Sequence, residues 1–596
     1  MAGISAFYHE SACCLLEDGR LTAAAAEERF SRVKHDPRLP VQAFRFCLEA
    51  AAGDGGEAGP APGLLDAVAY YESPVLKLSR QLWAGVPEDD PGDLPWLDPT
   101  QPERAIRERL GWDGPLHVYE HHRSHAASAF YFSGFPEAAI LTADGVGEWA
   151  TTTYGRGRGA ELELLEEVRF PHSLGLFYSA ITAYLGFRVN GGEYKVMGLA
   201  PYGRPRYAED LRRVLRSGPR GAFTLDMGFF EFLRGRRMYS AALCELLDGP
   251  PRRPGDEITP RHADVARSAQ EVLEEVLLEK VRHLHRLVGG EALCMAGGVA
   301  LNCVANGRIL REGPFRRLFV QPAAGDAGGA LGAAALAWRE LAGPDGPPVE
   351  PLRHVCLGPR WSGDEVAELL AATGLAAEDH RGREEVLVEA VAERLAAGQV
   401  VGWFHGAMEM GPRALGARSI LASPLGEGMR ERLNRHVKRR EGFRPFAPAV
   451  LAERAAEHFA LDHPSPYMLE TCAVTSALEL PAVIHVDGSA RPQTVDPEVA
   501  PRFAALLAAF ERRSSCPVLL NTSFNVAGEP IVRSPVDALC CAADAGLDAL
   551  VLEDFLLDRS AFPEDWPRLL GPWRATSSSP FGRSTSPLRE GLYTFV

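Results

Sequence analysis

The residues EALCMAGGVALNCVANGRILREGPFRRLFVQPAAGDAGGALGAA (291–334) predict the fold of the first half of the chain. Two short apolar runs, LCMA and RLFV, have the length of buried strands, and each enters a glycine-rich turn followed by a predicted helix. Just upstream, ADVARSAQEVLEEVLLEKVRHLHRLV (263–288) has apolar residues at helical spacing. Strands that alternate with helices predict a mixed α/β architecture.

The same pattern extends in both directions along the chain. Near the N-terminus we expect strands at ISAFYH (4–9) and after Ser11, with a turn at Asp18-Gly19. AAILTADG (138–145) is a predicted strand, and EWATTTYGRG (148–157) is its predicted hairpin partner. Beyond residue 351 the predicted helices are 386–398 and 429–437, and the predicted strands are 400–405 and 516–524. The second half is therefore also predicted to be α/β.

Length and composition give the expected domain organisation. A chain of 596 residues is too long for one ordinary domain. The stretch AGPDGPPVEP (342–351) has the proline and glycine content of a linker, which predicts a first domain at 1–341 and a second at 352–560. Residues 561–596, rich in serine and proline towards their end, are predicted to be a partly mobile tail, and 53–63 and 86–95 are predicted surface loops.

Charge and cysteine usage exclude several classes of protein. A net charge of −16 argues against nucleic acid as a partner. No apolar run is long enough for a membrane span, and the N-terminus does not resemble a signal peptide, so we expect no membrane partner and a cytoplasmic location. The 11 cysteines form no C-x-x-C pattern, which indicates reduced, buried thiols rather than disulfides or a zinc ribbon.

Two histidines and two aspartates form the first candidate site. If HHRSHAASAF (121–130) is helical, His121 and His125 share one face, a common arrangement for holding a metal, although structural histidines at this spacing are more frequent. Asp144 and Asp326 each follow a predicted strand, where α/β proteins bind ligands. Alternatively, each aspartate only caps its turn. A His₂Asp₂ set with open positions would suit Fe(II), Mn or Zn.

Glycine-rich turns between strand and helix predict a phosphate cradle for a nucleotide. Backbone N–H groups in such turns approach phosphate oxygens closely, and a helix N-terminus favours negative charge. The residues in question are Gly145, Gly147, Gly297 and Gly298, with Gly325–Gly329 as a third turn. GGEYKVMGLAPYG (191–203) adds Glu193 and Lys195 in a predicted loop. Neither the Walker A pattern nor G-x-G-x-x-G is present, so P-loop and Rossmann folds are not expected.

Arginine clusters in the second domain predict an anion site. Arg413, Arg444 and Arg491 lie among glycine, proline and aromatic residues rather than on charged faces, and guanidinium groups bind phosphate in a bidentate way. Arg418, His485 and Asn521 lie in the same blocks, whereas Arg439 and Arg440 fit a solvated helix face. In the first domain, His9 after the strand ISAFY is placed for general-base work, and Lys34 could reach an anion.

Eleven short blocks of the sequence, in their order along the chain, resemble one family, the O-carbamoyltransferases of antibiotic and nodulation-factor biosynthesis. The matching blocks run from residue 3 to about residue 555 and are AFYHESA, EERFSRVKH, HHRSHAASAF, DGVGE, GGEYKVMGLAPYG, GGVALN, GDAGGALGAA, MGPRALGARSIL, FRPFAPAV, HVDGSARPQTV and NTSFN. The resemblance implies an N-terminal domain with an actin-like ATPase core, similar to the tRNA threonylcarbamoyl transferase, and a C-terminal YrdC-like domain.

The resemblance also implies roles. The YrdC-like domain would make carbamoyl-adenylate from carbamoyl phosphate and ATP, and the first domain would move the carbamoyl group to an acceptor hydroxyl. His121, His125, Asp144 and Asp326 match the metal ligands, expected to hold Fe(II), with Mg also compatible with the use of ATP. His9 matches the general base, GGVALN with Asn302 matches the nucleotide site, and Lys34, Arg413, Arg444, Arg491 and Asn521 match contacts of carbamoyl phosphate and the adenylate.

Three other functions fit the sequence less well than carbamoyl transfer. A tRNA-modifying enzyme would need a polyanion-binding surface, which the net charge does not support. An actin-like sugar kinase would leave the arginine-rich second domain unexplained, and a nucleotide sensor without catalysis would leave His9 and the metal ligands unexplained. The sequence does not identify the acceptor, and it leaves open whether the protein is a monomer or a homodimer.

Overall fold

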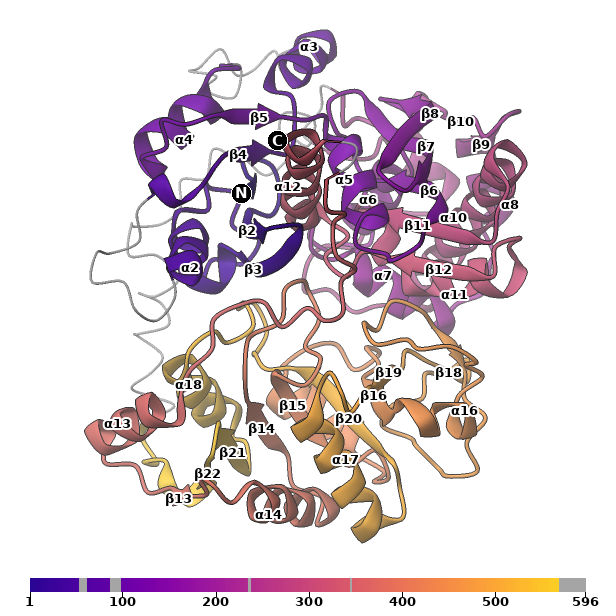
Figure 1. Cartoon of the computed structure of the whole chain (residues 1–596). Helices are drawn as coiled ribbons and strands as arrows, with labels where there is room; N and C mark the ends of the chain where they lie inside the picture. Colours follow the sequence, from indigo (N-terminus) through magenta and orange to yellow (C-terminus); the bar gives the residue numbers. More distant parts are fainter. Residues whose placement is uncertain (53–61, 86–97, 234–236, 344–345, 567–596) are drawn as a thin grey trace. The chain divides into compact units, whose positions relative to one another are not determined.

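The structure is a computed structural model that describes residues 1–52, 62–85, 98–233, 237–343 and 346–566 (Figure 1). The chain divides into two compact units. Of the described residues, the first contains Met1–Glu27 and His35–Leu352, and the second contains Glu28–Lys34 and residues 353–566. The short segment Glu28–Lys34 therefore packs with the second unit, although it lies within the range 1–341 of the predicted first domain.

The first unit contains two five-stranded sheets. One has the order β3-β2-β1-β4-β5, with antiparallel pairing among the first three strands and parallel pairing from β1 to β5. The other has the order β12-β11-β6-β7-β8, with β12, β11 and β6 parallel and β6, β7 and β8 antiparallel. The strands are β1 Ala2–Ser5, β2 Ala12–Glu17, β3 Arg20–Ala26, β4 Val68–Tyr70, β5 Leu116–Val118, β6 Glu137–Ala143, β7 Ala150–Arg158, β8 Glu161–Arg169, β11 Ala292–Ala296 and β12 Arg317–Val320, with a separate pair β9 Leu215–Ser217 and β10 Phe223–Leu225.

Two paired helices connect these sheets, α5 (His121–Phe130) and α12 (Asp326–Ala342) (Figure 1). Helix α12 contacts β1, β2 and β4, whereas α5 contacts β6, β7 and β11, and the two helices pack against each other. Their close approach depends on small residues. A Cβ atom at Gly332 would lie 1.7 Å from the carbonyl oxygen of Ser124, so only glycine allows α12 to lie this near α5. The metal-ligand candidates His121 and Asp326 begin these two helices.

The remaining helices of the first unit surround the sheets. The longest, α10 (Pro260–Val288), contacts β6 and β7 through its buried apolar face. Helix α2 (Val41–Ala52) covers β2 and β3. The others are α3 Pro74–Ala84, α4 Gln101–Leu110, α6 Leu174–Tyr184, α7 Glu193–Leu199, α8 Ala208–Val214, α9 Ala241–Leu246 and α11 Cys303–Glu312.

The second unit is built on one eight-stranded mixed sheet in the order β13-β22-β21-β14-β15-β20-β16-β19. Helices α14 and α17 pack against each other and against β14, β16 and β20, while α18 contacts β14 and β21. The sheet strands are β13 Glu378–Asp379, β14 Val401–Phe404, β15 Arg418–Ala422, β16 Ala447–Leu451, β19 Gln493–Val495, β20 Val518–Ser523, β21 Ala549–Leu552 and β22 Phe555–Asp558, and β17 Cys472–Ala473 pairs separately with β18 Ser489–Ala490. The helices are α1 Glu28–Ser31, α13 Gly363–Thr373, α14 Glu384–Ala396, α15 Met429–Arg432, α16 Ala455–His458, α17 Pro501–Ser514 and α18 Pro535–Ala545.

The α/β class and the quoted strands and helices are confirmed, with four corrections. The predicted helix 429–437 ends as α15 at Arg432 and continues as a π-helical turn, η6 (Leu433–Val437). Glu193 and Lys195 lie on helix α7, not in a loop. The turn that contains Gly145 and Gly147 joins two antiparallel strands rather than a strand and a helix, because the chain returns as β7 beside β6. Strand β1 ends at Ser5, so His9 lies beyond its end.

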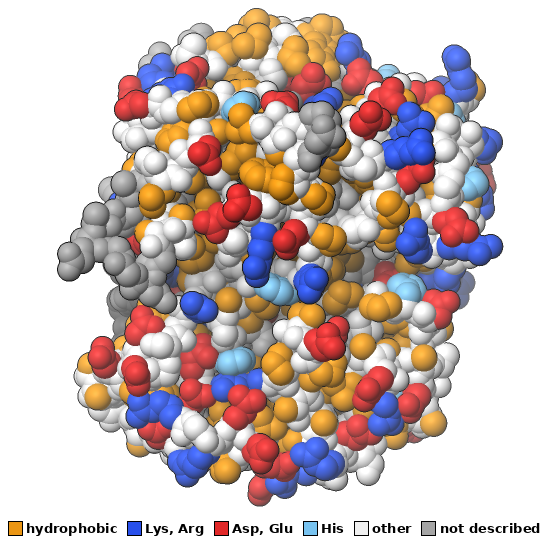
Figure 2. Space-filling model, viewed as in Figure 1, with side chains coloured by type: hydrophobic (Ala, Val, Ile, Leu, Met, Phe, Trp, Pro, Cys, Tyr) orange, Lys and Arg blue, Asp and Glu red, His pale blue; other side chains and the backbone are white. Residues whose placement is uncertain are grey.

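The predicted linker and loops are only partly described. Described residues of the linker run along the first unit: Glu350 N–H donates to the carbonyl of Gly19, and Leu352 N–H donates to that of Phe132. The predicted loops fall mostly, and the tail falls almost entirely, outside the described residues. On the face drawn in Figure 2, acidic and basic side chains are interspersed. Among the described residues, no helix combines the length and apolar character that crossing a bilayer would require.

Candidate metal centre and anion-binding residues

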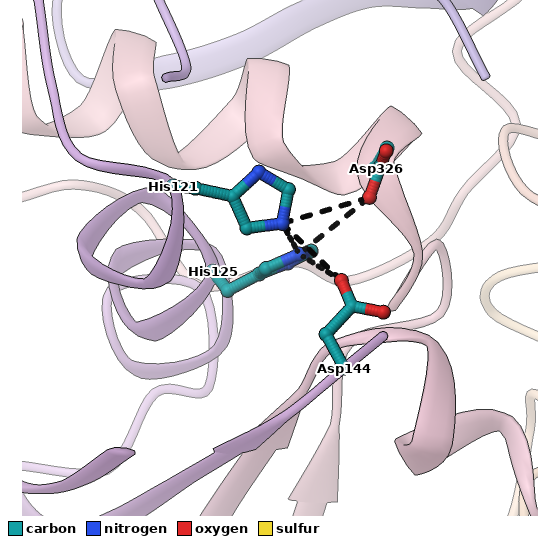
Figure 3. A group of neighbouring side chains, drawn as sticks. All are labelled: His121, His125, Asp144 and Asp326. Carbon is teal, nitrogen blue, oxygen red and sulfur yellow. Dashed lines mark hydrogen bonds and ion pairs between the residues drawn. The ribbon is translucent and has the colours of Figure 1, made fainter. Parts of the chain in front are cut away.

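Four side chains of the first unit converge on one point (Figure 3). His121 and His125 lie one turn apart on α5, as their spacing predicted. Asp144 follows strand β6 directly, and Asp326 is the first residue of α12. The Nε2 atoms of the two histidines are 3.0 Å apart, and Oδ2 of Asp144 lies 3.2 Å from His121 Nε2 and 3.0 Å from His125 Nε2. The exposed fraction of each of these four residues is 9% or less.

This arrangement fits a divalent cation. Oδ1 of Asp326 lies 3.7 Å from His121 Nε2 and 3.8 Å from His125 Nε2. Metal bonds of about 2.1 Å would place neighbouring ligand atoms roughly 3.0 to 3.4 Å apart in octahedral or tetrahedral geometry. Oδ2 of Asp326 is buried without a hydrogen-bond partner, which an ion beside the carboxylate would compensate. Two imidazoles and two carboxylates are donors that Fe(II), Mn and Zn share, so the residues do not select among these metals.

Burial and neighbouring charges shift the pKa values of Asp326 and His121. Burial is the largest influence on the pKa of Asp326 and, with the charge of Asp144, raises it well above its usual range. Burial alone would lower the pKa of His121, but the hydrogen bond to Asp144 and the neighbouring carboxylates raise it to about 9. Two buried carboxylates this close repel each other unless a positive charge lies between them.

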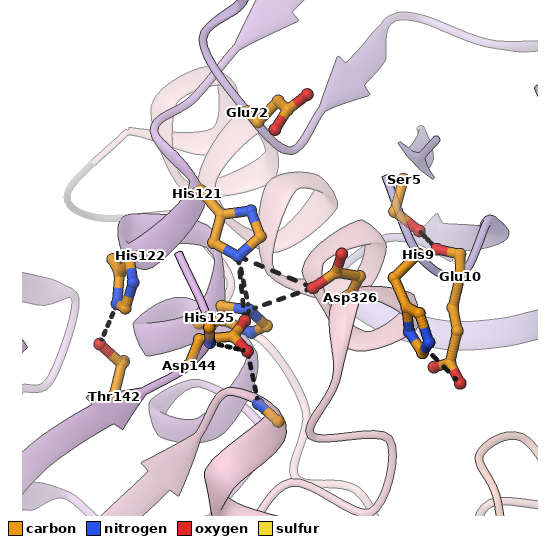
Figure 4. Close-up of polar contacts among 12 residues, drawn as sticks. Ser5, His9, Glu10, Glu72, His121, His122, His125, Thr142, Asp144 and Asp326 are labelled. Atoms are coloured by element: carbon orange, nitrogen blue, oxygen red, sulfur yellow. Dashed lines mark hydrogen bonds and ion pairs between the residues drawn. The ribbon is translucent and has the colours of Figure 1, made fainter. Parts of the chain in front are cut away.

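Backbone contacts and a further carboxylate hold the ligands in place. Asp144 Oδ1 accepts hydrogen bonds from the N–H groups of Gly145 and Gly298, so these two glycines, predicted to bind nucleotide, bind the aspartate here. The carboxylate of Glu148 accepts from the N–H of His121 and from that of Ser73. Glu148 could not be recognised from the sequence, since only the fold brings it to the first turn of α5. His122 points away from this centre and bonds Thr142 (Figure 4).

His9 belongs to a second cluster in the first unit (Figure 4). Its Nε2 atom contacts the carbonyl oxygen of Asn190, and its ring stacks on that of His35 with 4.8 Å between the centroids. Glu10 Oε1 lies 3.0 Å from His35 Nδ1 and 3.9 Å from His9 Nδ1. Burial is the largest influence on the pKa of His9 and lowers it, which favours the neutral imidazole that a general base requires.

The other predicted nucleotide-binding residues have structural partners. The carboxylate of Glu193 accepts from the N–H groups of Asn190, Gly191 and Gly192, and Lys195 Nζ lies over the ring of Phe187. Asn302 caps α11 by accepting from the N–H of Ala305. Gly297 has a φ of +91°, and a Cβ there would lie 2.2 Å from the carbonyl oxygen of Ala143. Gly147 lies in the β6–β7 turn, where a Cβ would touch His121.

In the second unit, the predicted residues fall into two groups. Arg413, Arg444 and Arg491 are partly exposed and lie on connecting segments. Arg418, Asn521 and His485 are buried. The Arg418 guanidinium donates to the carbonyls of His405, Ala417 and Pro359, and stacks 3.6 Å from the centroid of Phe404, while burial lowers its pKa to about 10. This places Arg418 in the core of the sheet, where it supports the loop that carries Arg413.

Three cationic side chains of this unit act on the buried Lys438. It is 4% exposed, and its ammonium group donates to the carbonyl oxygens of Ser523 and Asn525 and to the side-chain oxygen of Asn525. Burial, and then the charges of Arg440, Arg444 and Lys34, hold its pKa well below the usual range. The charges of Lys34 and Arg444 therefore both lower the pKa of Lys438, although these two residues are about 400 positions apart in the sequence.

A buried glutamate shapes the neighbouring loop. Oε1 of Glu409 accepts hydrogen bonds from the N–H groups of Leu415, Ala417 and Arg418, at 2.7, 2.8 and 3.2 Å. These three bonds fold residues 411–418 around the carboxylate and set the position of Arg413. The sequence analysis did not identify Glu409, because three backbone donors leave no pattern in the sequence.

Comparison with known proteins identifies the family of this chain. A family model described as "Carbamoyltransferase N-terminus" matches residues 1–54 and 107–335, and one described as "Carbamoyltransferase C-terminus" matches residues 392–559. Nodulation protein NolNO of Sinorhizobium fredii is 39% identical over 94% of this chain and 81% of its own length. The chain belongs to the carbamoyltransferase family. It is therefore a transferase, as its sequence predicted.

Two further relatives and one solved structure show the range of similarity to this carbamoyltransferase. "Uncharacterized protein sll1178" of Synechocystis is 44% identical over 94% of this chain and 97% of its own. The 3'-hydroxymethylcephem-O-carbamoyltransferase of Amycolatopsis lactamdurans is 33% identical over 61% of this chain and 65% of its own. Among solved structures, full-length HypF aligns over 28% of this chain and 20% of its own, with 19% identity and a TM-score of 0.21, which is too low to establish a shared fold.

Proposed function

We propose that this carbamoyltransferase makes carbamoyl-adenylate from carbamoyl phosphate and ATP with its second unit, and passes the carbamoyl group to a hydroxyl of a small-molecule acceptor with its first. The observation that carries the first step is the convergence of Lys34, Arg440 and Arg444 on the buried Lys438. In a protein of net charge −16, such a concentration of positive charge in one unit is suited to polyanionic substrates.

The first step needs charge neutralisation more than proton transfer. Water cleaves carbamoyl phosphate to carbamate and phosphate, and a carbamate oxygen then attacks the α-phosphorus of ATP while pyrophosphate leaves. Both substrates are anions, so the attack brings like charges together. Arg413 and Arg444, partly exposed on connecting segments, would bind the phosphate oxygens, and Arg491 would do the same from the segment between β18 and β19. We also propose that the second unit is a YrdC-like domain.

In the second step, the acceptor oxygen attacks the carbamoyl carbon. The O–H proton passes to the neutral His9, the new C–O bond forms, and the bond to AMP breaks with its electron pair leaving on the phosphate. His121, His125, Asp144 and Asp326 would hold the metal, for which we propose Fe(II), and a bound cation supplies Lewis-acid stabilisation of negative oxygen. We also propose that the first unit is actin-like and binds nucleotide around Gly297 and Gly298.

The first test is pyrophosphate release by the purified, metal-loaded protein. ATP and carbamoyl phosphate are supplied separately and together, and release is expected only with both. Arg444→Ala should lower the rate by about 100-fold or more, since a charge-assisted phosphate contact is lost. Arg435→Ala is the matched control, because the Arg435 side chain is 71% exposed and pairs only with Glu431 among the ion pairs observed in the described residues.

The outcomes separate carbamoyl transfer from other activities. Release with both substrates, and its loss in Arg444→Ala alone, would support the adenylating step and allow acceptors to be screened with a defined donor. No release by folded protein of verified metal content would contradict the proposed first step. Phosphate transfer from ATP to sugars would then be measured, since an ATP-dependent kinase reaction needs no carbamoyl phosphate.

A further inference from the structure

We propose that Glu10 is a positioning residue for His9, anchored by His35, and that His9 takes the acceptor proton on its Nδ1 atom. This inference rests on the role of His9 as the base in the proposed function. It assigns the reacting atom, and it gives tasks to two side chains that the comparisons leave without one. The geometry of the cluster carries it, and Figure 4 shows two of its members, His9 and Glu10.

The contact between His9 and Asn190 determines which nitrogen is free to react. His9 Nε2 contacts the main-chain carbonyl oxygen of Asn190. A carbonyl oxygen only accepts hydrogen bonds, so Nε2 must carry the proton in this contact. A neutral imidazole has one protonated nitrogen, and its lone pair is then on Nδ1. The unprotonated nitrogen therefore points towards Glu10, whose Oε1 lies 3.9 Å away.

His35 fixes the carboxylate in this place. His35 Nδ1 lies 3.0 Å from Glu10 Oε1, which makes it the donor of a hydrogen bond to the carboxylate. The ring of His35 also stacks on that of His9, with 27° between the planes. Its Nε2 faces Gly191, where a Cβ would lie only 2.9 Å away, so the ring is confined from that side as well.

The backbone ties the two halves of the cluster together. Phe7 N–H donates to the carbonyl of Pro37, and both the N–H and the hydroxyl of Ser11 donate to the carbonyl of Asp36. These bonds flank His9 and Glu10 on one strand connection and His35 on the other. The cluster is therefore assembled by two segments that are hydrogen-bonded on either side of it, rather than by a chance meeting of mobile side chains.

This geometry gives Glu10 a function in proton transfer. When His9 Nδ1 receives the hydroxyl proton, the imidazolium forms beside the carboxylate and is stabilised by its charge. The O–H bond breaks, the Nδ1–H bond forms, and the proton is later lost to solvent. The other charged groups that face His9 are His35, which opposes its protonation, and Glu193, which favours it. Glu10 thus acts on His9 through its charge, by supporting the charged form of the ring.

The test measures the reactivity of His9 and needs no knowledge of the acceptor. Diethyl pyrocarbonate acylates unprotonated imidazole nitrogen, and trypsin releases His9 in the peptide of residues 1–20, which contains no other histidine. The rate of acylation of this peptide is measured against pH in the full-length, metal-loaded protein. Glu10→Gln should move the midpoint to lower pH by about one unit, because a favourable charge is removed, and should lower the limiting rate. Glu10→Asp should bring the pH midpoint of acylation most of the way back to its wild-type value.

The control is Glu17→Gln, which removes an exposed carboxylate from the same peptide and should leave the profile of His9 unchanged. An unchanged midpoint in Glu10→Gln would overturn the proposal. So would protection of His9 by one added equivalent of Zn²⁺, because the cluster would then be a cation site, for which His9, Glu10 and His35 have suitable ligand atoms. Pyrophosphate release is measured on the same samples, so a failure of the proposed function is recognised separately.

Discussion

At the scale of single residues, the candidate metal centre is a balance of buried charges. Asp144 has hydrogen bonds to both histidines, which more than offset the effect of burial and hold its pKa well below the usual range. Asp326 lacks such close donors, and one of its oxygens is buried without a partner. The two carboxylates therefore differ: Asp144 is stabilised by the histidines and by two backbone N–H groups, and Asp326 gains most from a cation.

This difference predicts opposite effects of Asp326→Asn on metal content and on the metal-free fold. Removing one ligand should lower metal affinity by at least about 10-fold. The metal-free variant should be as stable as the metal-free wild type or more stable, since an amide removes the repulsion from Asp144. Metal content is measured by elemental analysis after dialysis, and stability by thermal unfolding with and without chelator.

Asp113→Asn is the control for this experiment, because Asp113 is exposed. A variant that keeps its full metal content would show that Asp326 is not a ligand. A metal-free variant much less stable than metal-free wild type would mean instead that the carboxylate supports the fold directly.

The grouping of His121, His125, Asp144 and Asp326 could be predicted from sequence because its signals are local, while their role as metal ligands stays a prediction. Two histidines four residues apart share a helix face, and an aspartate after an apolar strand lies at a sheet edge. Glu148 and Glu409 had no such signal, since each accepts backbone N–H groups whose positions depend on the folded chain. Asn302 and Glu193 were predicted to bind nucleotide and instead have capping or loop-stabilising partners in the structure, while their role with nucleotide stays a prediction.

At the scale of elements, the pairing of α5 and α12 brings the ligands together. Helix α5 supplies both histidines and α12 begins with Asp326, so the distance between their axes sets the distance between ligands. A Cβ at Gly329 would lie 2.5 Å from the ring of Tyr71, and one at Gly332 would collide with the backbone of α5. The run of glycine and alanine in α12 is thus a requirement of close packing.

Gly332→Ala should therefore damage the metal centre without touching it. The added methyl group forces α12 away from α5, at a cost of about 1 to 3 kcal/mol for overpacking. We expect a lower melting temperature and reduced metal content together. Gly63→Ala is the control, because a Cβ at Gly63 would meet no atom within 4 Å. Normal metal content in a destabilised Gly332→Ala would show that the centre tolerates a change in helix spacing.

Strands and helices were predictable where one period dominates, as in α10 and in the β6–β7 hairpin. The prediction was wrong where one feature admits two outcomes. A glycine-rich turn after a strand can lead into a helix or into an antiparallel strand, and at Gly145 the second occurs. GGEYKVMGLAPYG has enough glycine and proline to resemble a loop, yet Glu193 accepts the N–H groups that precede it and allows α7 to begin there.

At the scale of the whole molecule, the least predictable feature is that Glu28–Lys34 belongs to the second unit. Arg29 donates to the carbonyl of Gly411, and Arg32 donates to those of Pro530 and Ile531. No local pattern could reveal this, since these partners follow Arg29 and Arg32 by more than 350 positions. The segment also explains how Lys34 can contribute to the charge around Lys438.

Arg32→Ala should consequently weaken the second unit while leaving the first intact. The two lost hydrogen bonds and the nearby ion pair with Asp537 should cost about 1 to 3 kcal/mol, because the two carbonyls lose a charged donor. Hydrogen–deuterium exchange should become faster in residues 530–545, which include α18, and should not change in α5 or α10. Arg45→Ala, at an exposed position of α2, is the control. Faster exchange confined to the first unit would contradict the division of the chain. Faster exchange in 530–545 together with weaker pyrophosphate release would show that Glu28–Lys34 supports the proposed adenylating step from within the second unit.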